Sequence, residues 1–270
     1  MSTEVTLDTK FVKNKESLPW PQPSSNKVEM LFSSIIVFAK KEKFNNLLLY
    51  DAINKILNKN KILAPYLYKE NYNKNYIEIQ DFGNETIFKK LYKNKNNKFR
   101  YFKKIINLLN KIQLIKIKKI KNFKNKNYII PKYEKKILIQ EANLFCDWYL
   151  KKNLPKITKA KFSKKFKKIT KQLTSNLKLK NNFFVHRDFH VSNIMPVNKK
   201  LGIIDTQDAI LGNPMYDLAS LLDDVRVKVP AQIKGKILKY YLKKCSIKNK
   251  QIYFLKNDFD LYISSNSSMP

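Results

Sequence analysis

Three polar residues in one short segment have the types and spacing needed to move a phosphoryl group. Asp188 lies in the run His186-Arg187-Asp188-Phe189-His190, and Asn193 follows Asp188 by five residues. Asp205 comes directly after two apolar residues, Ile203 and Ile204. A carboxylate placed like Asp188 can accept the proton of an attacking hydroxyl, which typically accelerates a reaction about 10²–10⁴-fold. Asn193 and Asp205 offer the hard oxygen ligands that Mg²⁺ prefers, with nucleotide phosphates and water completing its shell. This set suits phosphoryl transfer, which depends mainly on positioning and charge neutralisation.

The same three residues also have structural roles open to them. An aspartate or asparagine in a loop often caps a turn, and an aspartate after a strand often caps the next helix. For one aspartate alone, that interpretation would be favoured. Three such residues in this order, in a strand–loop–strand setting, favour Asp188 as the base and Asn193 and Asp205 as metal ligands.

The two histidines of the chain both lie within this segment. His186 is expected to hydrogen-bond the backbone and so brace the loop. His190 is expected to orient the catalytic aspartate or to border the substrate. A zinc pair is disfavoured because the other candidate ligands, Cys146 and Cys245, are distant in the sequence.

Further polar residues follow the second aspartate. Gln207 and Asp208 come shortly after Asp205, so they could border the substrate or support the metal ligands from outside. Asp208 could instead cap the next segment, but support of the metal is the favoured role. Asp217 opens an expected helix, where either the helix dipole stabilises it or it braces the catalytic loop.

The elements expected around these residues form a larger, mostly helical lobe. Residues 183–185 predict a short buried strand leading into the catalytic loop, residues 186–193. Residues 194–195 and 201–204 flank a turn at 198–200, which predicts a hairpin ahead of the metal-binding segment, residues 203–208. Apolar residues at helical spacing predict helices over 99–120, 140–150, 162–179, 216–224 and 233–243.

The front of the chain predicts a smaller, mixed lobe over residues 1–84. Residues 35–38 are β-branched or aromatic and predict a strand, 43–57 have helical spacing, and 76–80 alternate as a second strand. Residues 1–30 are expected to be irregular because Pro19, Pro21 and Pro23 interrupt any helix there. The pattern is α+β, with residues 85–270 forming the larger lobe.

The composition limits the classes of protein that the chain can belong to. A hydrophobic share of 43% over 270 residues is that of a globular protein. The formal net charge of +34 could indicate nucleic-acid binding, but of the 55 basic residues only Arg100, Arg187 and Arg226 are arginines. Solvated lysines that attract anions such as nucleotides are favoured over a specific nucleic-acid site.

The cysteine count and the longest apolar runs bear on location. Two cysteines fit a reducing compartment rather than a disulfide framework. Residues 1–10 lack the pattern of a signal peptide, and residues 31–39 are too few to span a bilayer. We therefore expect a cytoplasmic monomer that binds a small molecule and no membrane.

The segments quoted above resemble a known family. The run from His186 to His190 with Asn193 resembles the catalytic loop of the aminoglycoside/choline phosphotransferase-like kinases. Residues 204–209 and 212–226 narrow the likeness to the bacterial anomeric N-acetylmuramate/N-acetylglucosamine 1-kinases of cell-wall recycling. Residues 77–83 and 141–149 are similar to further segments of that family, and the likeness covers residues 35–245.

The resemblance implies a bilobal protein-kinase-like fold with a β-containing N-lobe and a larger helical C-lobe. It implies that ATP and Mg²⁺ are used to phosphorylate the anomeric hydroxyl of an amino sugar. Asp188 would then be the catalytic base, and Asn193 and Asp205 would bind the metal. The strand and hinge ending in Gln80, Asp81 and Phe82 would meet adenine through the backbone.

The chain departs from the family pattern near its ends. Its first glycine is Gly83, so residues 1–30 offer no glycine-rich loop to cover phosphates, and Lys40 and Lys41 are two lysines among many. We therefore expect an incomplete N-lobe and a truncated C-terminus.

Other functions stay open on the sequence alone. One is a kinase of choline, an aminoglycoside or homoserine, whose cationic acceptors would need an acidic pocket. Such a pocket could draw on Asp147, Asp208, Asp223 and Asp224. In a different class, the chain could be an inactive or nucleic-acid-binding lysine-rich protein.

Overall fold

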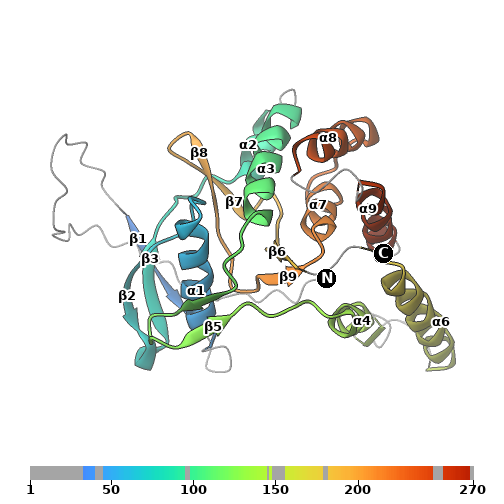
Figure 1. Cartoon of the computed structure of the whole chain (residues 1–270), viewed down its shortest axis with the longest axis horizontal. Coiled ribbons are helices and arrows are strands. Elements are labelled where there is room, and N and C mark those ends of the chain that lie inside the picture. The colour runs from blue at the N-terminus through green and yellow to red at the C-terminus, as the bar shows by residue number, and fades with distance from the viewer. Residues whose placement is uncertain are drawn as a thin grey trace.

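A three-stranded antiparallel sheet forms the N-terminal part of the structure (Figure 1). The computed structural model describes residues 33–39, 45–94, 98–144, 146–147, 156–178, 182–245 and 252–267. In the sheet, β3 (Tyr76–Gln80) lies between β1 (Ser34–Phe38) and β2 (Leu67–Asn71). Val37 pairs with Ile77, and these two residues are buried against helix α1 (Asn45–Lys59).

Helix α1 is buried on two sides and joins the sheet to the rest of the molecule. Its residues Leu47 and Tyr50 pack with the sheet. Its other buried apolar residues pack into the main core, and they are Ala52, Ile53, Ile56 and Leu57. Because protein interiors are close-packed, a helix shared between two clusters fixes the sheet relative to the larger part of the chain.

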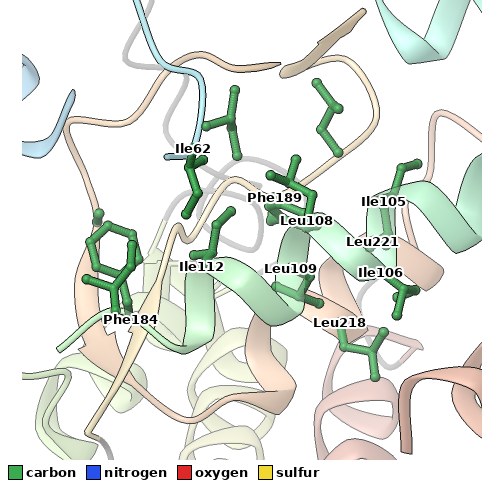
Figure 2. Packing of buried hydrophobic residues seen from close by; sticks show 14 of the residues in the cluster. Ile62, Ile105, Ile106, Leu108, Leu109, Ile112, Phe184, Phe189, Leu218 and Leu221 are labelled. Carbon is green, nitrogen blue, oxygen red and sulfur yellow. The ribbon is translucent and has the colours of Figure 1, made fainter. Parts of the chain in front are cut away.

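The main core is built around α3 (Lys98–Gln113) (Figure 2). Five of its side chains at helical spacing are fully buried: Phe102, Ile105, Ile106, Leu109 and Ile112. The same cluster contains Leu218 and Leu221 of α7 (Met215–Leu222) and the buried face of α8 (Ala231–Lys244). Burying one such aliphatic side chain stabilises a fold by about 1.5–3 kcal/mol, so this stripe is a principal source of stability.

Several further elements surround this core. The helices are α2 (Ile87–Lys93), α4 (Lys135–Leu144), α6 (Lys156–Ser175) and α9 (Ile252–Ser267). Strands β4 (Lys119–Lys121) and β5 (Asn127–Ile129) form a small hairpin. None of the helices in the described part of the chain is long and apolar enough to cross a membrane.

Two short antiparallel pairs carry the polar segment of interest. Strand β6 (Phe183–Val185) pairs with β9 (Ile210–Gly212), and β7 (Ile194–Val197) pairs with β8 (Lys200–Ile203). The loop from β6 to β7 and the segment from β8 to β9 therefore connect the same two strand pairs. This topology brings the two ends of the polar segment together.

Most elements expected from the sequence are confirmed. The strands at 35–38, 76–80 and 183–185 and the hairpin around 198–200 are present, as are helices in each expected region. The helix expected over 99–120 ends at Gln113, and the prediction was wrong beyond that point because Ile115 and Ile120 are buried outside a helix. The expected irregularity of residues 1–30 and parts of helices 43–57 and 140–150 lie outside the described residues.

Candidate active site

The β7–β8 hairpin places Asn193 beside Asp205. Ile194 pairs with Ile203, so the residues just outside this pair, Asn193 and Ile204, face each other. The Ile204 N–H donates to the Asn193 carbonyl oxygen at 3.0 Å. The Asn193 amide also hydrogen-bonds the Asp205 carboxylate. The two residues thus meet at the open end of the hairpin, one beside each of its strands.

Asp188 joins the same cluster through the catalytic loop. Asn193 donates from Nδ2 to the Asp188 carbonyl oxygen at 3.1 Å, and the His190 N–H donates to that oxygen at 3.0 Å. Phe189 is fully buried and fixes the loop in the core. The structure therefore brings Asp188, Asn193 and Asp205 together.

The carboxyl groups of this cluster disfavour ionisation in one another. Burial, together with the charges of Asp205 and Asp208, raises the pKa of Asp188 to about 6. Burial also raises the pKa of Asp205, while hydrogen bonds from Gln207 and Asn193 lower it. A cation beside these groups would offset their repulsion.

The donor set fits Mg²⁺. Asp205 offers a carboxylate and Asn193 an amide, and Mg²⁺ is commonly bound through one or two carboxylates while water and substrate phosphates complete its shell. Within the described ranges, no group of three or more His, Cys, Asp or Glu side chains is placed to hold a metal by itself.

His186 and Asp217 brace the catalytic loop. His186 is fully buried, and its Nε2 contacts the Ile204 carbonyl oxygen at 3.1 Å. Burial lowers the pKa of His186 to about 3, so the neutral ring donates this bond. Asp217, at the start of α7, accepts from the N–H groups of His186 and Arg187 at 2.8 and 3.0 Å. The expected backbone bond of His186 is confirmed, and Asp217 makes the expected bracing contacts.

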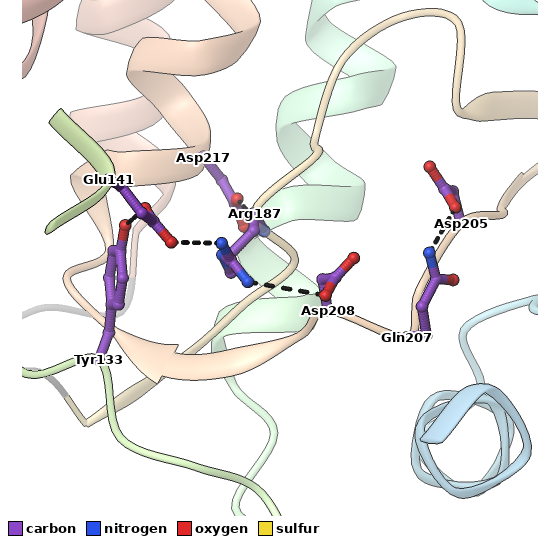
Figure 3. A network of polar contacts seen from close by, with 7 residues as sticks. All are labelled: Tyr133, Glu141, Arg187, Asp205, Gln207, Asp208 and Asp217. Atoms are coloured by element: carbon purple, nitrogen blue, oxygen red, sulfur yellow. Dashed lines mark hydrogen bonds and ion pairs between the residues drawn. The ribbon is translucent and has the colours of Figure 1, made fainter. Parts of the chain in front are cut away.

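Arg187 connects the catalytic loop to α4 and to the metal-binding segment (Figure 3). Its φ of 75° is in the left-handed region, which costs a non-glycine residue about 1–2 kcal/mol. Nη2 donates to Glu141 Oε1 at 2.5 Å, and Nη1 lies 3.7 Å from Asp208 Oδ1. The guanidinium lies 5.7 Å from the centre of the Tyr133 ring, and the Tyr133 hydroxyl donates to Glu141. These contacts hold a strained residue directly before Asp188.

Neutral hydrogen bonds fix the metal-binding segment against α1. Thr206 Oγ1 donates to Asn54 Oδ1 at 2.6 Å, and both residues are buried. Asn54 in turn donates to the Pro65 carbonyl oxygen at 3.0 Å. Gln207 Nε2 donates to Asp205 Oδ1 at 2.7 Å and so orients the carboxylate. Asp205 itself has a φ of 61°, which aspartate tolerates better than most residues.

A second arginine lies in the turn after α7. The N–H and Nη1 of Arg226 both donate to Asp224 Oδ1, at 2.9 and 3.2 Å. The Asp224 side chain is 1% exposed and that of Arg226 is 43% exposed. Burial, together with the charge of Arg226, lowers the pKa of His190 to about 4. His190 Nε2 lies 3.2 Å from Asn193 Nδ2, so this arginine acts on the edge of the site.

The segment expected to meet adenine links β3 to α2. The N–H groups of Gln80 and Asp81 donate to backbone carbonyl oxygens at 2.8 and 2.9 Å. The Phe82 ring packs on Gly202 of β8, where an added Cβ would lie 2.7 Å from Phe82 Cε2. Glycine at position 202 therefore lets this segment contact the hairpin that precedes Asp205.

Some residues of the site carried no clear signal in the sequence. Glu141 lies in a segment that resembles the kinase family, but nothing in the sequence predicts its ion pair with Arg187. Tyr133 and Asn54 had no chemical signal because their partners come from distant elements. Asp208 was expected near the metal, and its ion pair is with Arg187.

The arrangement is that of a kinase-type phosphotransferase. Residues 44–248 match the model of the phosphotransferase enzyme family, and the chain belongs to this family. Among solved structures, the ADP-bound aminoglycoside phosphotransferase APH(2'')-Ib is similar, with a TM-score of 0.59 and 17% identity over 85% of this chain and 88% of that chain. The Plasmodium vivax ethanolamine kinase has a TM-score of 0.55 and 15% identity over 87% and 67% of the two chains. The expected bilobal, protein-kinase-like α+β fold is confirmed.

Curated relatives cover a smaller part of the chain. The N-acetylmuramate/N-acetylglucosamine kinase of Neisseria meningitidis is 33% identical over 100 residues, which are 37% of this chain and 30% of that protein. The protein of the same name from Pseudomonas aeruginosa is 31% identical over 118 residues, 44% of this chain and 35% of that protein. The chain thus matches about a third of the length of each relative.

Proposed function

We propose that this protein transfers the γ-phosphoryl group of ATP to the anomeric hydroxyl of N-acetylmuramate or N-acetylglucosamine. The observation that carries the proposal is the meeting of Asp188, Asn193 and Asp205 at the end of one hairpin. The names of the curated relatives support the choice of acceptor. The setting that follows is cell-wall recycling by a monomer in the cytoplasm.

In this proposal Asp188 accepts the proton of the acceptor hydroxyl as its oxygen attacks phosphorus. A pKa of about 6 leaves Asp188 largely ionised at neutral pH while keeping it more basic than an ordinary aspartate. Asn193 and Asp205 would hold Mg²⁺, which when bound neutralises phosphate charge and orients the transferred group.

The neighbouring polar residues position these groups. Gln207 fixes the Asp205 carboxylate, and His190 contacts the Asn193 amide, so both act on the proposed metal ligands. Asp208 forms an ion pair with Arg187, and its charge helps to raise the pKa of Asp188. Gln207, His190 and Asp208 would therefore affect catalysis by positioning the reacting groups.

Residues 1–84 would form the nucleotide lobe, with Gln80, Asp81 and Phe82 beside adenine. Because the N–H groups of Gln80 and Asp81 are bonded within the protein, the Phe82 N–H is the backbone donor that we propose for adenine. Lys40 and Lys41, the lysines considered for the phosphates, lie outside the described residues.

The test is a phosphoryl-transfer assay with radiolabelled ATP and Mg²⁺. The acceptors are N-acetylmuramate, N-acetylglucosamine, choline, homoserine and an aminoglycoside. Label is expected on the two amino sugars, and it should be released by mild acid because an anomeric phosphate is acid-labile. Labelling of choline or the aminoglycoside alone, or an acid-stable sugar phosphate, would overturn the proposed acceptor.

A further inference from the structure

The tip of the β4–β5 hairpin, residues 122–126, contacts the three-stranded sheet. Phe123 packs against the buried cluster of the sheet, and its ring lies 5.9 Å from the Tyr72 ring in a T-shaped arrangement. Lys124 Nζ lies 3.3 Å from Glu70 Oε1 of β2 and 5.3 Å from the centre of the Tyr72 ring. Tyr72 begins the short 3₁₀ helix η2 (Tyr72–Lys74) between β2 and β3. The hairpin tip therefore holds the end of the sheet at which β2 turns into β3.

The hairpin tip is fixed by its own hydrogen bonds. Asn122 is buried, and its Oδ1 accepts from the N–H groups of Lys124 and Lys126 at 3.0 and 3.2 Å. Its carbonyl oxygen accepts from the N–H of Asn125 at 2.9 Å, and Asn125 has a φ of 56°, which asparagine tolerates better than most residues. Phe123 is thus presented to the sheet by a backbone of defined shape.

The stretch of chain that forms the hairpin continues to the catalytic loop. Beyond β5, the Tyr133 N–H donates to the carbonyl oxygen of Leu211 in β9 at 2.8 Å. The Tyr133 hydroxyl donates to Glu141, and Glu141 pairs with Arg187, which directly precedes Asp188. Residues 119–141 therefore contact the sheet at one end and the catalytic loop at the other.

The sheet leads directly to the segment proposed to meet adenine. Strand β2 pairs with β3, with Glu70 opposite Ile77, and β3 ends at Gln80. A displacement of β2 would therefore move Gln80 and the residues after it. Helix α1 supports the buried face of the sheet and contacts β4 of the hairpin, which lies beside it in Figure 1. A second support at the turn end keeps the sheet from tilting about this helix.

We propose that Phe123 and Lys124 are positioning residues for phosphoryl transfer, which hold the sheet so that bound nucleotide is aligned with Asp188. The proposal rests on the proposed function, because alignment matters only if a phosphoryl group passes to an acceptor beside this base. Transfer depends on the geometry of the reacting atoms, and a misplacement of about 1 Å can lower the rate about 10²-fold. These two residues would act through the sheet and would touch neither nucleotide nor acceptor.

The experiment compares Phe123→Ala with the wild type. At saturating substrates kcat should fall about 10-fold, because the sheet loses its support at the turn end. Mg·ATP affinity, measured by calorimetry, should change less than about threefold, because the proposed adenine segment and metal ligands are untouched. Phe99→Ala is the matched control, since Phe99 is also half-buried under a lysine, with Lys103 Nζ 5.1 Å from its ring centre, but packs on the main core. It should lower stability and leave kcat unchanged.

A charge exchange tests the second contact of the hairpin tip. Lys124→Glu places two like charges together and should lower kcat about threefold, a small effect because both side chains are about 35% exposed. Adding Glu70→Lys restores an opposite pair and should recover most of the loss. A double variant that is slower than Lys124→Glu would overturn the role of Lys124.

Three results would overturn the role of Phe123. The first is a kcat of Phe123→Ala within twofold of the wild type despite a lower free energy of unfolding, which would mean that the hairpin tip only stabilises the fold. The second is a loss confined to Mg·ATP affinity. The third is an equal loss of kcat in Phe99→Ala.

A structural measurement separates this proposal from the proposed function. If the wild type transfers no phosphoryl group, the proposed function fails, and the hold on the sheet is then measured directly. Spin labels on the exposed sites Lys69→Cys of β2 and Lys239→Cys of α8, with Cys245→Ser as background, report the distance between the sheet and the main core by pulsed electron paramagnetic resonance. A distribution broadened by Phe123→Ala but not by Phe99→Ala would support the hold, and an unchanged distribution would overturn it.

Discussion

The catalytic loop and the metal-binding segment lie side by side but are held by different kinds of interaction. In the catalytic loop, Arg187 meets Glu141 and Asp208, and Asp217 accepts two backbone N–H groups. The metal-binding segment shares the Asp208–Arg187 ion pair with the loop, but its contact with α1 is the uncharged Thr206–Asn54 hydrogen bond. The loop is therefore held mainly by charged contacts, and the metal-binding segment is anchored to α1 by a neutral one.

This difference has physical consequences for the two segments. Charge-assisted contacts are strong but are screened by salt when they are partly exposed. Neutral buried hydrogen bonds are insensitive to salt, and leaving one group unpaired is costly. Each segment also contains a residue in the left-handed region, Arg187 and Asp205, so each needs outside contacts to keep its geometry.

The largest effect is expected from Asp188→Asn. Asparagine is close in size but cannot accept the hydroxyl proton, so kcat should fall about 10²–10⁴-fold while the fold and nucleotide affinity are kept. Steady-state kinetics with N-acetylglucosamine and a nucleotide titration measure the two quantities. Turnover within threefold of the wild type would remove Asp188 as the base.

Asp205→Asn should act on nucleotide binding and so contrast with the first variant. Losing the carboxylate weakens the metal contact, and Mg·ATP affinity should fall about 10–100-fold. Affinity for the sugar should change much less. A calorimetric titration with Mg·ATP checks this, and an affinity equal to that of the wild type would count against the metal assignment.

Glu141→Gln tests the charged contacts of the catalytic loop. It keeps the volume but removes the partner of Arg187, so kcat should fall about 10-fold with little change in nucleotide affinity. The gap between variant and wild type should narrow as salt rises, because the wild-type pair is about 30% exposed. Glu85→Gln breaks a more exposed ion pair with Lys93 and should change neither quantity. A gap of constant size at all salt concentrations would contradict the role assigned to this ion pair.

Local pattern was enough to predict the elements that carry the site. The apolar run before His186 and the turn at 198–200 predicted the strand and the hairpin that place Asn193 beside Asp205. The helix expected over 99–120 was too long, because Ile115 and Ile120 continue an apolar spacing that a buried non-helical segment satisfies equally well. Strands β2 and β9 were missed because short strands owe their formation to pairing partners elsewhere in the chain.

The contacts that position the site were harder to predict from the sequence than the residues proposed to act on the substrate and the metal. Asp188, Asn193 and Asp205 could be selected because they occur close together with a known chemical spacing. Asn54 is 152 residues from Thr206, and Glu141 is 46 residues from Arg187. A single sequence holds no periodicity that links such pairs, since the link is made only by the packing of α1 and α4.

Thr206→Val tests the neutral contacts of the metal-binding segment. Valine keeps the shape but removes the hydroxyl that donates to Asn54, so the free energy of unfolding should fall by about 1–2 kcal/mol. Thr206→Ser keeps the donor and should lose less. Chemical denaturation at low and high salt should give the same loss, in contrast to the salt-dependent effect of Glu141→Gln. A loss that shrinks in salt would mean that this segment also depends on charge.

The smallest expected effect concerns the pH dependence of stability. The folded pKa of Asp188, about 6, lies above its ordinary value of 3.8, so the native state binds more protons than the unfolded state between these values. Stability should therefore fall as pH rises through this window, and Asp188→Asn, which has no charge to bury, should escape the loss. After allowance for partial solvent screening, the variant should be more stable by about 1–2 kcal/mol above pH 7 and no more stable below pH 4. Denaturation across pH measures the difference, with the exposed Glu134→Gln as a matched control. A stability difference that does not vary with pH would show that the gain comes from packing. Ionisation of the Asp188 carboxyl would then not destabilise the folded protein.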